Sequence, residues 1–456
     1  MDNAPPSSPT TCVVGAGPAG LALARAFRRL ELPVQVFERH DAVGGLWNFD
    51  NPGTPLYESA HFISSKTLSA FPGYPWPAGT PDYPSWEQVR DYLHDFARAY
   101  ELNDVITTGC GVESATWLGD HWQVETDRGE LHRFDNLVCA NGALWHPNMP
   151  EFDGEFGGDI IHSVDYRSID DLRNRRVLVV GAGNSGVDIA GDAAIAASKA
   201  VLSMRRGYHF VPKHIFGTPA DVFAEQGPTL PARLEQLFFT ALLRLTVGKP
   251  ERYGLPTPDH KILQTHPILN SAIFGHLSHG DLTVATGVER LEGNIVHFSD
   301  GTSGEFDLII CATGYDVAVP YLDSESLEWK QGRPQMLMHL FDRSNPHLFS
   351  LGFCEGDGGG YPIFDEMADA IANTVRLVGR ADGDPPTRWT RHLRSASPQT
   401  RPHTKLLNSS RHVNYVHLHA YRKALEHMRT DFGWRPYQAD EPVLDGTGSP
   451  VGVAGG

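Results

Sequence analysis

The stretch that most constrains the fold is the glycine-rich sequence TCVVGAGPAG at residues 11–20. Its first four residues are apolar or β-branched, which predicts a buried strand. The glycines follow as G-x-G-x-x-G, and an apolar pattern with helical spacing runs through residues 21–30. A second strand is predicted at residues 34–37, directly before Glu38. Strand, glycine turn, helix, strand and acid in this order are the fingerprint of a dinucleotide-binding unit.

Each glycine of this unit has its own mechanical role. Gly15 allows the tight turn, Gly17 lets a pyrophosphate approach the backbone, and Gly20 lets the helix pack against the strand. The helix N-terminus offers free N–H groups and a positive dipole end to phosphate oxygens. The Glu38 carboxylate stands where it can accept hydrogen bonds from a ribose. We therefore interpret the unit as a nucleotide site rather than as a structural turn.

A second unit of the same kind reads VLVVGAGNSG at residues 177–186, with the glycines Gly181, Gly183 and Gly186. In the frame of the first unit, Met204 takes the place of Glu38, and Arg205 and Arg206 follow it. A guanidinium is planar and permanently charged and binds a 2′-phosphate well, whereas a carboxylate would repel it. The sequence thus predicts FAD at the first unit and NADP at the second. The alternative for the arginines is a solvated surface pair.

A glycine pair and a large aromatic residue, Gly44-Gly45-Leu46-Trp47, follow the second predicted strand. This loop suits contact with a flat cofactor ring, and a turn with a core tryptophan fits it equally well. Residues 51–85 are rich in Pro, Gly, Ser and aromatic side chains, so they predict irregular structure. They are too aromatic for a disordered linker, and we interpret them as an ordered covering loop.

Composition excludes several classes of function. The chain has 456 residues, of which 41% are hydrophobic and 20% charged, which indicates a soluble protein of two or three domains. A formal net charge of −17 disfavours nucleic acid and anionic membranes as partners. The five cysteines show neither metal-ligand spacing nor C-x-x-C, so we expect no metal site and a reducing, cytoplasmic setting. No signal peptide and no membrane anchor are expected either.

Further elements are predicted along the chain. We expect a helix at 85–100 capped by Ser85, a small antiparallel excursion within 112–134 and a last helix at 417–432. Residues 230–247 are strongly apolar and predict a helix inside a long insert. Its basic face is thin for a membrane-surface helix, so a buried or partner-facing helix is the preferred interpretation.

The stretch between the two glycine units contains the spacing F-x-G-x-x-x-H-x-x-x-Y, formed by Phe156, Gly158, His162 and Tyr166. Together with the paired fingerprints, it resembles the flavin-containing monooxygenases, which are single-component, NADPH-dependent flavoproteins. The loop at Gly44–Trp47 and the sequence Ala312-Thr313-Gly314-Tyr315 are similar to two further motifs of that family. The resemblance extends from about residue 13 to residue 378.

The resemblance implies an α/β fold of two dinucleotide-binding (Rossmann-like) domains, with the NADPH domain inserted into the FAD domain. The FAD-binding domain is then expected at 11–168 and 301–440, and the NADPH-binding domain at 169–300 with a helical insert at 207–280. Residues 1–10 and 441–456 are expected to be a disordered lead and tail.

The resemblance also implies a chemistry. NADPH reduces FAD, O₂ adds at flavin C4a, and the hydroperoxide transfers one oxygen to a soft nucleophile, an amine nitrogen or a thioether sulfur of a small molecule. The rival is Baeyer–Villiger oxygenation of a ketone with the same cofactors, in which family a tryptophan usually replaces Tyr166. A disulfide reductase needs a redox cysteine pair, and a non-catalytic FAD- and NADP-binding protein is the alternative from another class. A monomer and a homodimer both stay open.

One position departs from the family pattern. The family places an Asn three residues before a Lys beside the flavin, and here Lys66 is preceded at that distance by Ile63. An aliphatic side chain neither donates nor accepts a hydrogen bond. His61, Ser64 and Ser65 are the candidates to replace the amide, and no catalytic residue is assigned beyond them.

The remaining expectations concern the C-terminal third and the cofactor contacts. A glycine-rich segment at 356–360 precedes a predicted helix at 363–378, and our hypothesis is that its dipole faces the flavin pyrimidine edge. Residues 382–413 are polar and basic and are expected at the surface. The residues expected to contact FAD or NADPH are Gly15, Gly17, Pro18, Ala19, Gly20, Glu38, Arg39, Gly45, Leu46, Trp47, His61, Gly181, Gly183, Asn184, Ser185, Gly186, Arg205, Arg206, Thr313, Gly314 and Tyr315.

Overall fold

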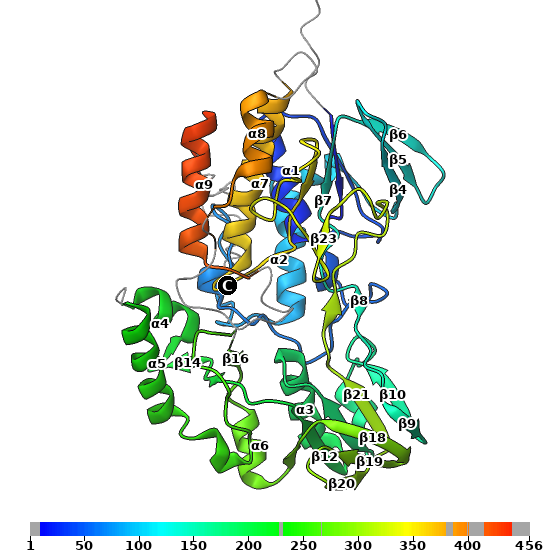
Figure 1. The fold of residues 1–456 in the computed structure, drawn as a ribbon, viewed down its shortest axis with the longest axis vertical. Coiled ribbons are helices and arrows are strands. Elements are labelled where there is room, and N and C mark those ends of the chain that lie inside the picture. Colours follow the sequence, from blue (N-terminus) through cyan, green and yellow to red (C-terminus); the bar gives the residue numbers. More distant parts are fainter. Residues whose placement is uncertain are drawn as a thin grey trace, which may run out of the picture.

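Two parallel sheets organise the computed structural model, which describes residues 10–227, 231–265, 267–379, 386–398, 400 and 415–439 (Figure 1). The first sheet has the order β25-β7-β1-β2-β3, with strands Thr11–Val14 (β1), Val34–Phe37 (β2), Ile106–Thr107 (β3), Asn136–Cys139 (β7) and Leu348–Ser350 (β25). The second has the order β10-β21-β11-β12-β17, with strands Asp159–His162 (β10), Arg176–Val180 (β11), Lys199–Ser203 (β12), Leu282–Ala285 (β17) and Leu308–Cys311 (β21). Both predicted glycine units therefore lie in parallel sheets, as expected.

Helices cover the first sheet. They are Pro18–Arg29 (α1), Trp86–Ala99 (α2), Gly360–Val378 (α7) and Leu418–Phe432 (α9). The predicted capping of α2 is confirmed, since the Ser85 N–H donates to Gln88 Oε1 at 3.0 Å and the Ser85 side chain caps the first turn. Its apolar face is buried at Val89, Leu93 and Phe96. The final helix is confirmed as well, whereas α7 begins three residues earlier than predicted, at Gly360.

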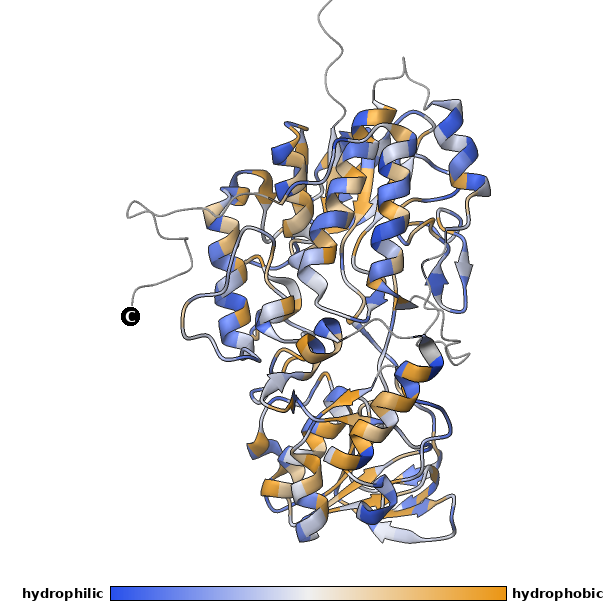
Figure 2. Cartoon of the chain, turned by 90° about the vertical axis from the view of Figure 1, so that its left-hand side faces the viewer, coloured by the Kyte–Doolittle hydropathy of each residue, from blue (hydrophilic) through white to orange (hydrophobic). Residues whose placement is uncertain are grey.

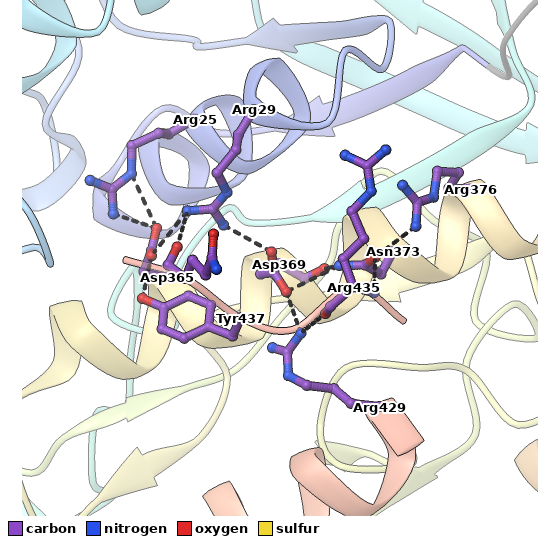
Figure 3. A network of polar contacts seen from close by, with 10 residues as sticks. Arg25, Arg29, Asp365, Asp369, Asn373, Arg376, Arg429, Arg435 and Tyr437 are labelled. Carbon is purple, nitrogen blue, oxygen red and sulfur yellow. Dashed lines mark hydrogen bonds and ion pairs between the residues drawn. The ribbon is translucent and has the colours of Figure 1, made fainter. Parts of the chain in front are cut away.

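A buried network of charges joins α1, α7 and α9 (Figure 3). Arg25 Nε donates to Asp365 Oδ1 at 3.1 Å, and Arg29 Nη2 donates to Asp369 Oδ1 at 2.9 Å. Arg429 of α9 donates to the other oxygen of Asp369 at 2.6 Å. The two arginines of α1 are one turn apart and so are the two aspartates of α7, so the pairs meet in register. The network holds α1 against helices that lie more than three hundred residues later in the chain.

The second sheet reaches beyond the expected range 169–300 at both ends. Its edge strand β10 lies before that range, and the neighbouring inner strand β21 lies after it. A smaller sheet of the same domain is built from Asp153–Phe156 (β9), Val288–Gly293 (β18), Ile295–Phe298 (β19) and Ser303–Glu305 (β20). The predicted boundaries were therefore too narrow, because the linker motif supplies strands to this domain and is more than a connector.

The insert carries three of the described helices: Ala220–Gln226 (α4), Ala232–Thr246 (α5) and Ile273–His279 (α6). The helix α5 was predicted to be buried or to face a partner, and it is buried on one side only. Leu242 is buried, while Leu237 and Leu245 are 66% and 80% exposed. Figure 2, in which the left-hand side of Figure 1 faces the viewer, colours much of the helices in the lower part of the molecule as hydrophobic. The helix Asn184–Ala196 (α3) lies between the insert and the second sheet (Figure 1).

Smaller elements complete the described chain. The antiparallel excursion is confirmed as β4, β5 and β6, at Val112–Trp117, Trp122–Thr126 and Leu131–Phe134. Short strands occur at His146–Pro147 (β8), Phe210–Val211 (β13), His214–Ile215 (β14), Thr218–Pro219 (β15), Ile268–Leu269 (β16), Tyr315–Asp316 (β22), Trp329–Lys330 (β23), Arg333–Pro334 (β24), Glu355–Gly356 (β26) and Tyr415–Val416 (β27). Single 3₁₀ turns occur at Gly45–Trp47 (η1), Lys66–Leu68 (η2), Leu102–Val105 (η3), Ile169–Leu172 (η4) and Pro250–Tyr253 (η5).

The stretch 382–413 differs from the prediction where the structure describes it. Residues Thr387–Ser395 form a helix (α8), and its Trp389 and Leu393 side chains are buried. Tryptophan and leucine four residues apart share one helix face, which is why a polar and basic segment still contributes to the core. The predicted lead at 1–10 and tail at 441–456 lie outside the described residues, apart from residue 10. In the part of the chain that is described, no helix is both long and apolar enough to cross a bilayer.

Candidate functional site: two dinucleotide units

The two glycine turns are repeated down to individual hydrogen bonds. The N–H of Gly15 donates to the carbonyl of Phe37 at 2.8 Å, and that of Gly181 donates to the carbonyl of Ser203 at 3.0 Å. The first strand of each unit is thereby joined to the second at the point where the turn begins. The hydrogen bonds also place the residues after Phe37 and after Ser203 at equivalent positions beside the two turns.

A third strand closes each turn from the other side. Gly15 and Gly181 have φ angles of +104° and +106°, a region that glycine adopts without strain. A Cβ on Gly15 would lie 2.6 Å from the carbonyl oxygen of Ala140, and one on Gly181 would lie 2.5 Å from that of Ala312. Neither contact leaves room for a side chain. Both glycines are therefore required by conformation and by close approach.

The third strands carry a repeat that the sequence analysis missed. Residues 134–142 read FDNLVCANG and residues 306–314 read FDLIICATG. In each repeat the aspartate accepts a hydrogen bond from a backbone N–H at the start of the unit's first strand. The Thr10 N–H donates to Asp135 Oδ2 at 2.7 Å, and the Arg176 N–H donates to Asp307 Oδ2 at 2.9 Å. The shared spacing F-D-x-x-x-C-A-x-G was the available signal. It shows that Thr313 and Gly314 in the second unit correspond to Asn141 and Gly142 in the first.

The middle glycine of each turn, Gly17 or Gly183, faces open space, which a bound phosphate group needs. A Cβ on Gly183 would have no heavy atom within 4 Å, and one on Gly17 would meet only Gly45, at 3.6 Å. Neither α1 nor α3 has a side-chain hydrogen bond at its N-cap. The Asn184 Oδ1 at the start of α3 is buried without a partner among the described residues. Free N–H groups facing open space at Gly17 and Gly183 fit a bound pyrophosphate, whose oxygens accept hydrogen bonds.

Glu38 is held by the first glycine turn itself. Its Oε2 accepts the N–H of Ala16 at 2.7 Å, and its Oε1 accepts the N–H of His40 at 3.0 Å. Burial raises the pKa of this carboxyl above its usual value, while the two backbone N–H groups oppose that rise. Each oxygen keeps a lone pair free, so the side chain can still accept ribose hydroxyls. Arg39 turns away and lies over the Trp145 ring at 4.3 Å.

Arg205 and Arg206 follow Met204, the residue after β12 that takes the place of Glu38. Arg205 is exposed, and the guanidinium of Arg206 lies 5.3 Å from the Tyr208 ring centroid. Across the described chain, neither guanidinium forms an ion pair with a carboxylate. Two guanidinium groups without an ion-pair partner in the described chain, at the end of the second strand, fit a 2′-phosphate better than an uncharged ribose hydroxyl.

The loop at Gly44–Trp47 lies directly against the first glycine turn. The N–H of Gly44 donates to the carbonyl of Ala16 at 2.9 Å, and a Cβ on Gly45 would lie 2.9 Å from Gly17 Cα. Leu46 and Trp47 form the 3₁₀ turn that follows, and the Trp47 ring lies 5.1 Å from that of Phe62. Trp47 is only partly buried, so it does not settle between the ring-contact and core interpretations.

The candidate side chains of the loop at residues 61–66 differ in exposure and in hydrogen bonding. Ile63 is 44% exposed, and the Nδ1 of His61 lies 2.8 Å from the carbonyl of Ser59. The Ser64 hydroxyl is paired with that of Ser69 at 2.7 Å. The Ser65 hydroxyl is buried with no partner in the described structure. Of the three candidates to replace the family's amide, only Ser65 combines burial with an unused hydrogen-bonding group.

The side chains of the linker motif contact the second unit. His162 Nε2 hydrogen-bonds the carbonyl of Gly314 at 3.1 Å, and its ring lies edge-on to Tyr315 at 5.0 Å. Burial lowers the pKa of His162, so the neutral ring that donates to Gly314 is favoured. The Tyr166 hydroxyl donates to Asp192 Oδ2 at 2.9 Å. The two motif side chains therefore hold the end of β21 and the middle of α3.

The glycine-rich segment before α7 is packed more tightly than expected. A Cβ on Gly359 would lie 1.7 Å from the carbonyl oxygen of Leu68, so this segment rests on η2. The first turn of α7 carries neither an acidic residue nor a side-chain cap. The dipole hypothesis thus stays a prediction, with η2 as the direct neighbour of the helix start.

Metal and disulfide chemistry find no support in the described residues. No group of His, Cys, Asp and Glu side chains there could hold a metal ion, and all five cysteines are free. Burial raises the pKa of the Cys139 thiol to about 12 and that of Cys311 to about 11. Such thiols are poor nucleophiles, because the thiolate is the reactive form.

Comparisons with known proteins agree with this geometry. A model of the family described as flavin-binding monooxygenase-like matches residues 9–375. The probable indole-3-pyruvate monooxygenase YUCCA8 of Arabidopsis thaliana is 28% identical over 397 residues, which cover 83% of this chain and 91% of the relative. Indole-3-pyruvate monooxygenase YUCCA6 of the same plant is 30% identical over 363 residues, or 75% and 84%. Flavin-containing monooxygenase 3 of Rattus norvegicus is 28% identical over 393 residues, or 80% and 73%.

Solved structures show the same fold. An oxidized steroid monooxygenase bound to NADP superimposes with a TM-score of 0.70 at 20% identity, covering 93% of this chain and 98% of that one. The S-allyl-L-cysteine S-oxygenase from Allium sativum gives a TM-score of 0.64 at 20% identity, with coverage of 94% and 90%. The family match spans most of the chain, and both glycine units fit the groups the family uses. The chain belongs to the flavin-binding monooxygenase-like family and is an FAD-containing, NADPH-dependent monooxygenase with its NADPH domain inserted into its FAD domain.

Proposed function

We propose that this enzyme transfers one oxygen atom from O₂ to a soft nucleophile of a small molecule, an amine nitrogen or a thioether sulfur. The observation that carries the proposal is Tyr166, which completes the linker motif and is fully buried on Asp192. Its position between β10 and α3 makes it part of the rigid frame around the second glycine turn. A tryptophan would lack the hydroxyl that donates to Asp192.

The two units divide the cofactors between them in this proposal. The first holds FAD, with Gly17 against the pyrophosphate and Glu38 accepting the ribose hydroxyls. The second holds NADPH, with Gly183 and Asn184 against the pyrophosphate and Arg205 against the 2′-phosphate, joined by Arg206. When bound, the flavin accepts a hydride from NADPH and supplies the activated oxygen. The protein positions both groups and excludes water.

An aromatic cluster supplies the dry wall of the proposed site. The Phe62 ring lies 5.1 Å from Trp47 and 5.4 Å from Tyr361, and Phe62 and Tyr361 are both buried. These residues join the loop after the first glycine turn, the covering loop and the start of α7. Water is excluded most effectively where large apolar side chains pack without polar groups between them. The buried Ser65 hydroxyl lies in the same covering loop and is our candidate for the missing amide.

A second candidate is oxygenation at a carbonyl carbon. It is supported by the relatives named indole-3-pyruvate monooxygenases, which are 28–30% identical to this chain. Indole-3-pyruvate is a 2-oxo acid, and its oxygenation needs a nucleophilic oxygen, whereas amines and thioethers need an electrophilic one. Ile63, which stands in place of an amide hydrogen-bond donor, is compatible with a nucleophilic and with an electrophilic oxygen.

The test compares substrate classes under ¹⁸O₂. The purified, FAD-loaded enzyme is incubated with NADPH and one of four probes: N,N-dimethylaniline, methyl p-tolyl sulfide, cyclohexanone or indole-3-pyruvate. We expect labelled N-oxide or sulfoxide and no labelled lactone. Labelled product from a carbonyl probe alone would reject heteroatom oxygenation and select the second candidate. NADPH oxidation that yields only H₂O₂ with amines and thioethers would also contradict the proposal.

A further inference from the structure

A cavity of about 350 Å³ lies beside α3. Its walls come from three parts of the chain: the middle of α3, Ser59 of the covering loop and the insert around Lys213, Asn270 and His276. The volume is at the lower end of the range for small-molecule sites. Neither the proposed cofactor contacts nor the aromatic cluster line it.

A glycine inside α3 opens this cavity. Gly191 lies in the interior of the helix, where glycine costs roughly 1 kcal/mol relative to alanine. A Cβ at this position would have no heavy atom within 4 Å. Close helix packing therefore does not account for the glycine. The empty space in front of it belongs to the cavity.

The cavity presents a free anionic oxygen. The Ser59 and Tyr166 hydroxyls both donate to Asp192 Oδ2, at 2.5 and 2.9 Å. Oδ1 of the same carboxylate has no hydrogen-bond partner in the described residues. One turn earlier, Asp188 is satisfied on both oxygens, by Tyr57 at 3.2 Å and Asn270 at 2.7 Å. An ammonium group is the ligand chemistry that Asp192 Oδ1 would accept.

The opposite wall presents a free cation. The Lys213 ammonium lies over the Tyr83 ring at 5.0 Å, and no ion pair engages it anywhere in the described chain. It is close enough to Asp188 to act on that carboxyl, since its charge opposes the rise in pKa that burial causes. The side chain of His276 adds a second donor without a hydrogen bond of its own among the described residues. A carboxylate is the natural partner of these two groups.

We propose that this cavity binds a free α-amino acid with an apolar side chain, its ammonium group on Asp192 Oδ1 and its carboxylate on Lys213 and His276. The apolar walls at Val187, Ile195 and Ile273 receive the side chain. A simple amine is repelled by Lys213, and a simple carboxylate is repelled by Asp188 and Asp192. Only a zwitterion satisfies both walls. Since the cavity joins both domains and the insert, its occupant contacts all three.

The experiment is a calorimetric titration of the FAD-loaded enzyme with L-phenylalanine. The matched probes are 2-phenylethylamine, which lacks the carboxylate, and 3-phenylpropionate, which lacks the ammonium group. Losing one charge-assisted contact weakens binding about tenfold to a hundredfold, so both probes are expected to bind at least tenfold more weakly. No saturable binding of phenylalanine, or equal affinity for either probe, overturns the proposal.

Variants locate the site. Gly191→Leu fills the cavity and is expected to abolish phenylalanine binding. The matched control is Gly275→Leu, since Gly275 is an exposed glycine of α6 with equally open surroundings. This control variant is expected to keep phenylalanine binding. Lys213→Met is expected to weaken phenylalanine binding at least tenfold and to strengthen 2-phenylethylamine binding, since the repelling charge is gone. Unchanged phenylalanine affinity in Gly191→Leu or Lys213→Met places the ligand elsewhere and overturns the assignment. Gly183→Val, designed to lose NADPH, should still bind phenylalanine, so this inference and the proposed function fail separately.

Discussion

The Tyr166 hydroxyl donates to Asp192 Oδ2 at 2.9 Å and ties the last residue of the linker motif to the middle of α3. Asp192 also accepts a hydrogen bond from the Ser59 hydroxyl, so one carboxylate of α3 contacts both the linker and the covering loop. Burial and the neighbouring Asp192 both raise the pKa of Tyr166, so its hydroxyl stays protonated and keeps donating. Asp192 thus joins the linker motif and the covering loop to the same helix.

The first prediction concerns nucleotide choice. Arg205→Ala combined with Arg206→Ala removes two cations that lack carboxylate partners in the described chain. A charge-assisted contact to phosphate is worth about 1.5–3 kcal/mol. The Michaelis constant for NADPH should therefore rise about tenfold to a hundredfold, and that for NADH should change little. Steady-state kinetics with both nucleotides measure this. Arg290→Ala, at an exposed arginine paired with Glu292, is the control, and equal loss with both nucleotides would reject the assignment.

The second prediction separates the phosphate cradle from packing. Gly183→Val places a side chain in open space in front of α3, so the protein should fold and retain FAD but lose NADPH binding. Gly186→Ala should instead disturb the domain, since its Cβ would lie 2.0 Å from the carbonyl oxygen of Gly181. Thermal melting, flavin absorbance and NADPH titration distinguish the two outcomes. NADPH binding that survives in Gly183→Val would place the pyrophosphate elsewhere.

The third prediction concerns the covering loop. Ile63→Asn supplies an amide donor and acceptor where the chain has an aliphatic side chain. It should preserve FAD and NADPH binding and change the fraction of oxidised NADPH that yields H₂O₂. Ser65→Ala removes the buried, unpaired hydroxyl and should raise that fraction, whereas Ser64→Ala should change it less, since Ser64 is paired with Ser69.

Peroxide yield per NADPH, measured with and without a thioether substrate, decides this question. If all three variants give the same peroxide yield as the wild type, the loop at residues 61–66 does not line the flavin. The comparison of Ile63 with the family's active-site amide would then be wrong.

The fourth prediction concerns the buried charge network of Figure 3. Asp369→Ala leaves Arg29 and Arg429 without their shared carboxylate, and Asp369 and Arg429 are only 4% and 5% exposed. Breaking a buried pair in this way costs about 3–5 kcal/mol. The urea midpoint of the FAD-loaded enzyme should fall clearly. Glu292→Ala breaks an exposed pair, worth about 0–1 kcal/mol, and is the control. Equal midpoints in the two variants would contradict a stabilising role for the network.

The sequence by itself determined the local parts of this protein. Glycine spacing dictates the two turns, because only glycine tolerates φ near +105° and a carbonyl within van der Waals reach. The same frame distinguishes Glu38 from Arg205 and Arg206, since equivalent strand ends follow equivalent turns. The capped helix after Ser85 is equally local, because a capping box and a 3.6-residue apolar period need no distant partner.

Only the tertiary structure decided which distant residues meet. The ion pair of Arg25 with Asp365 joins positions 340 residues apart, and no local pattern marks the two as partners. The linker strand β10 joined the second domain because its partner is β21, far along the chain. Ser65 is buried while its neighbour Ile63 is exposed, contrary to their polarity. Periodicity and spacing act over a few residues, whereas burial and pairing depend on how whole sheets and helices pack.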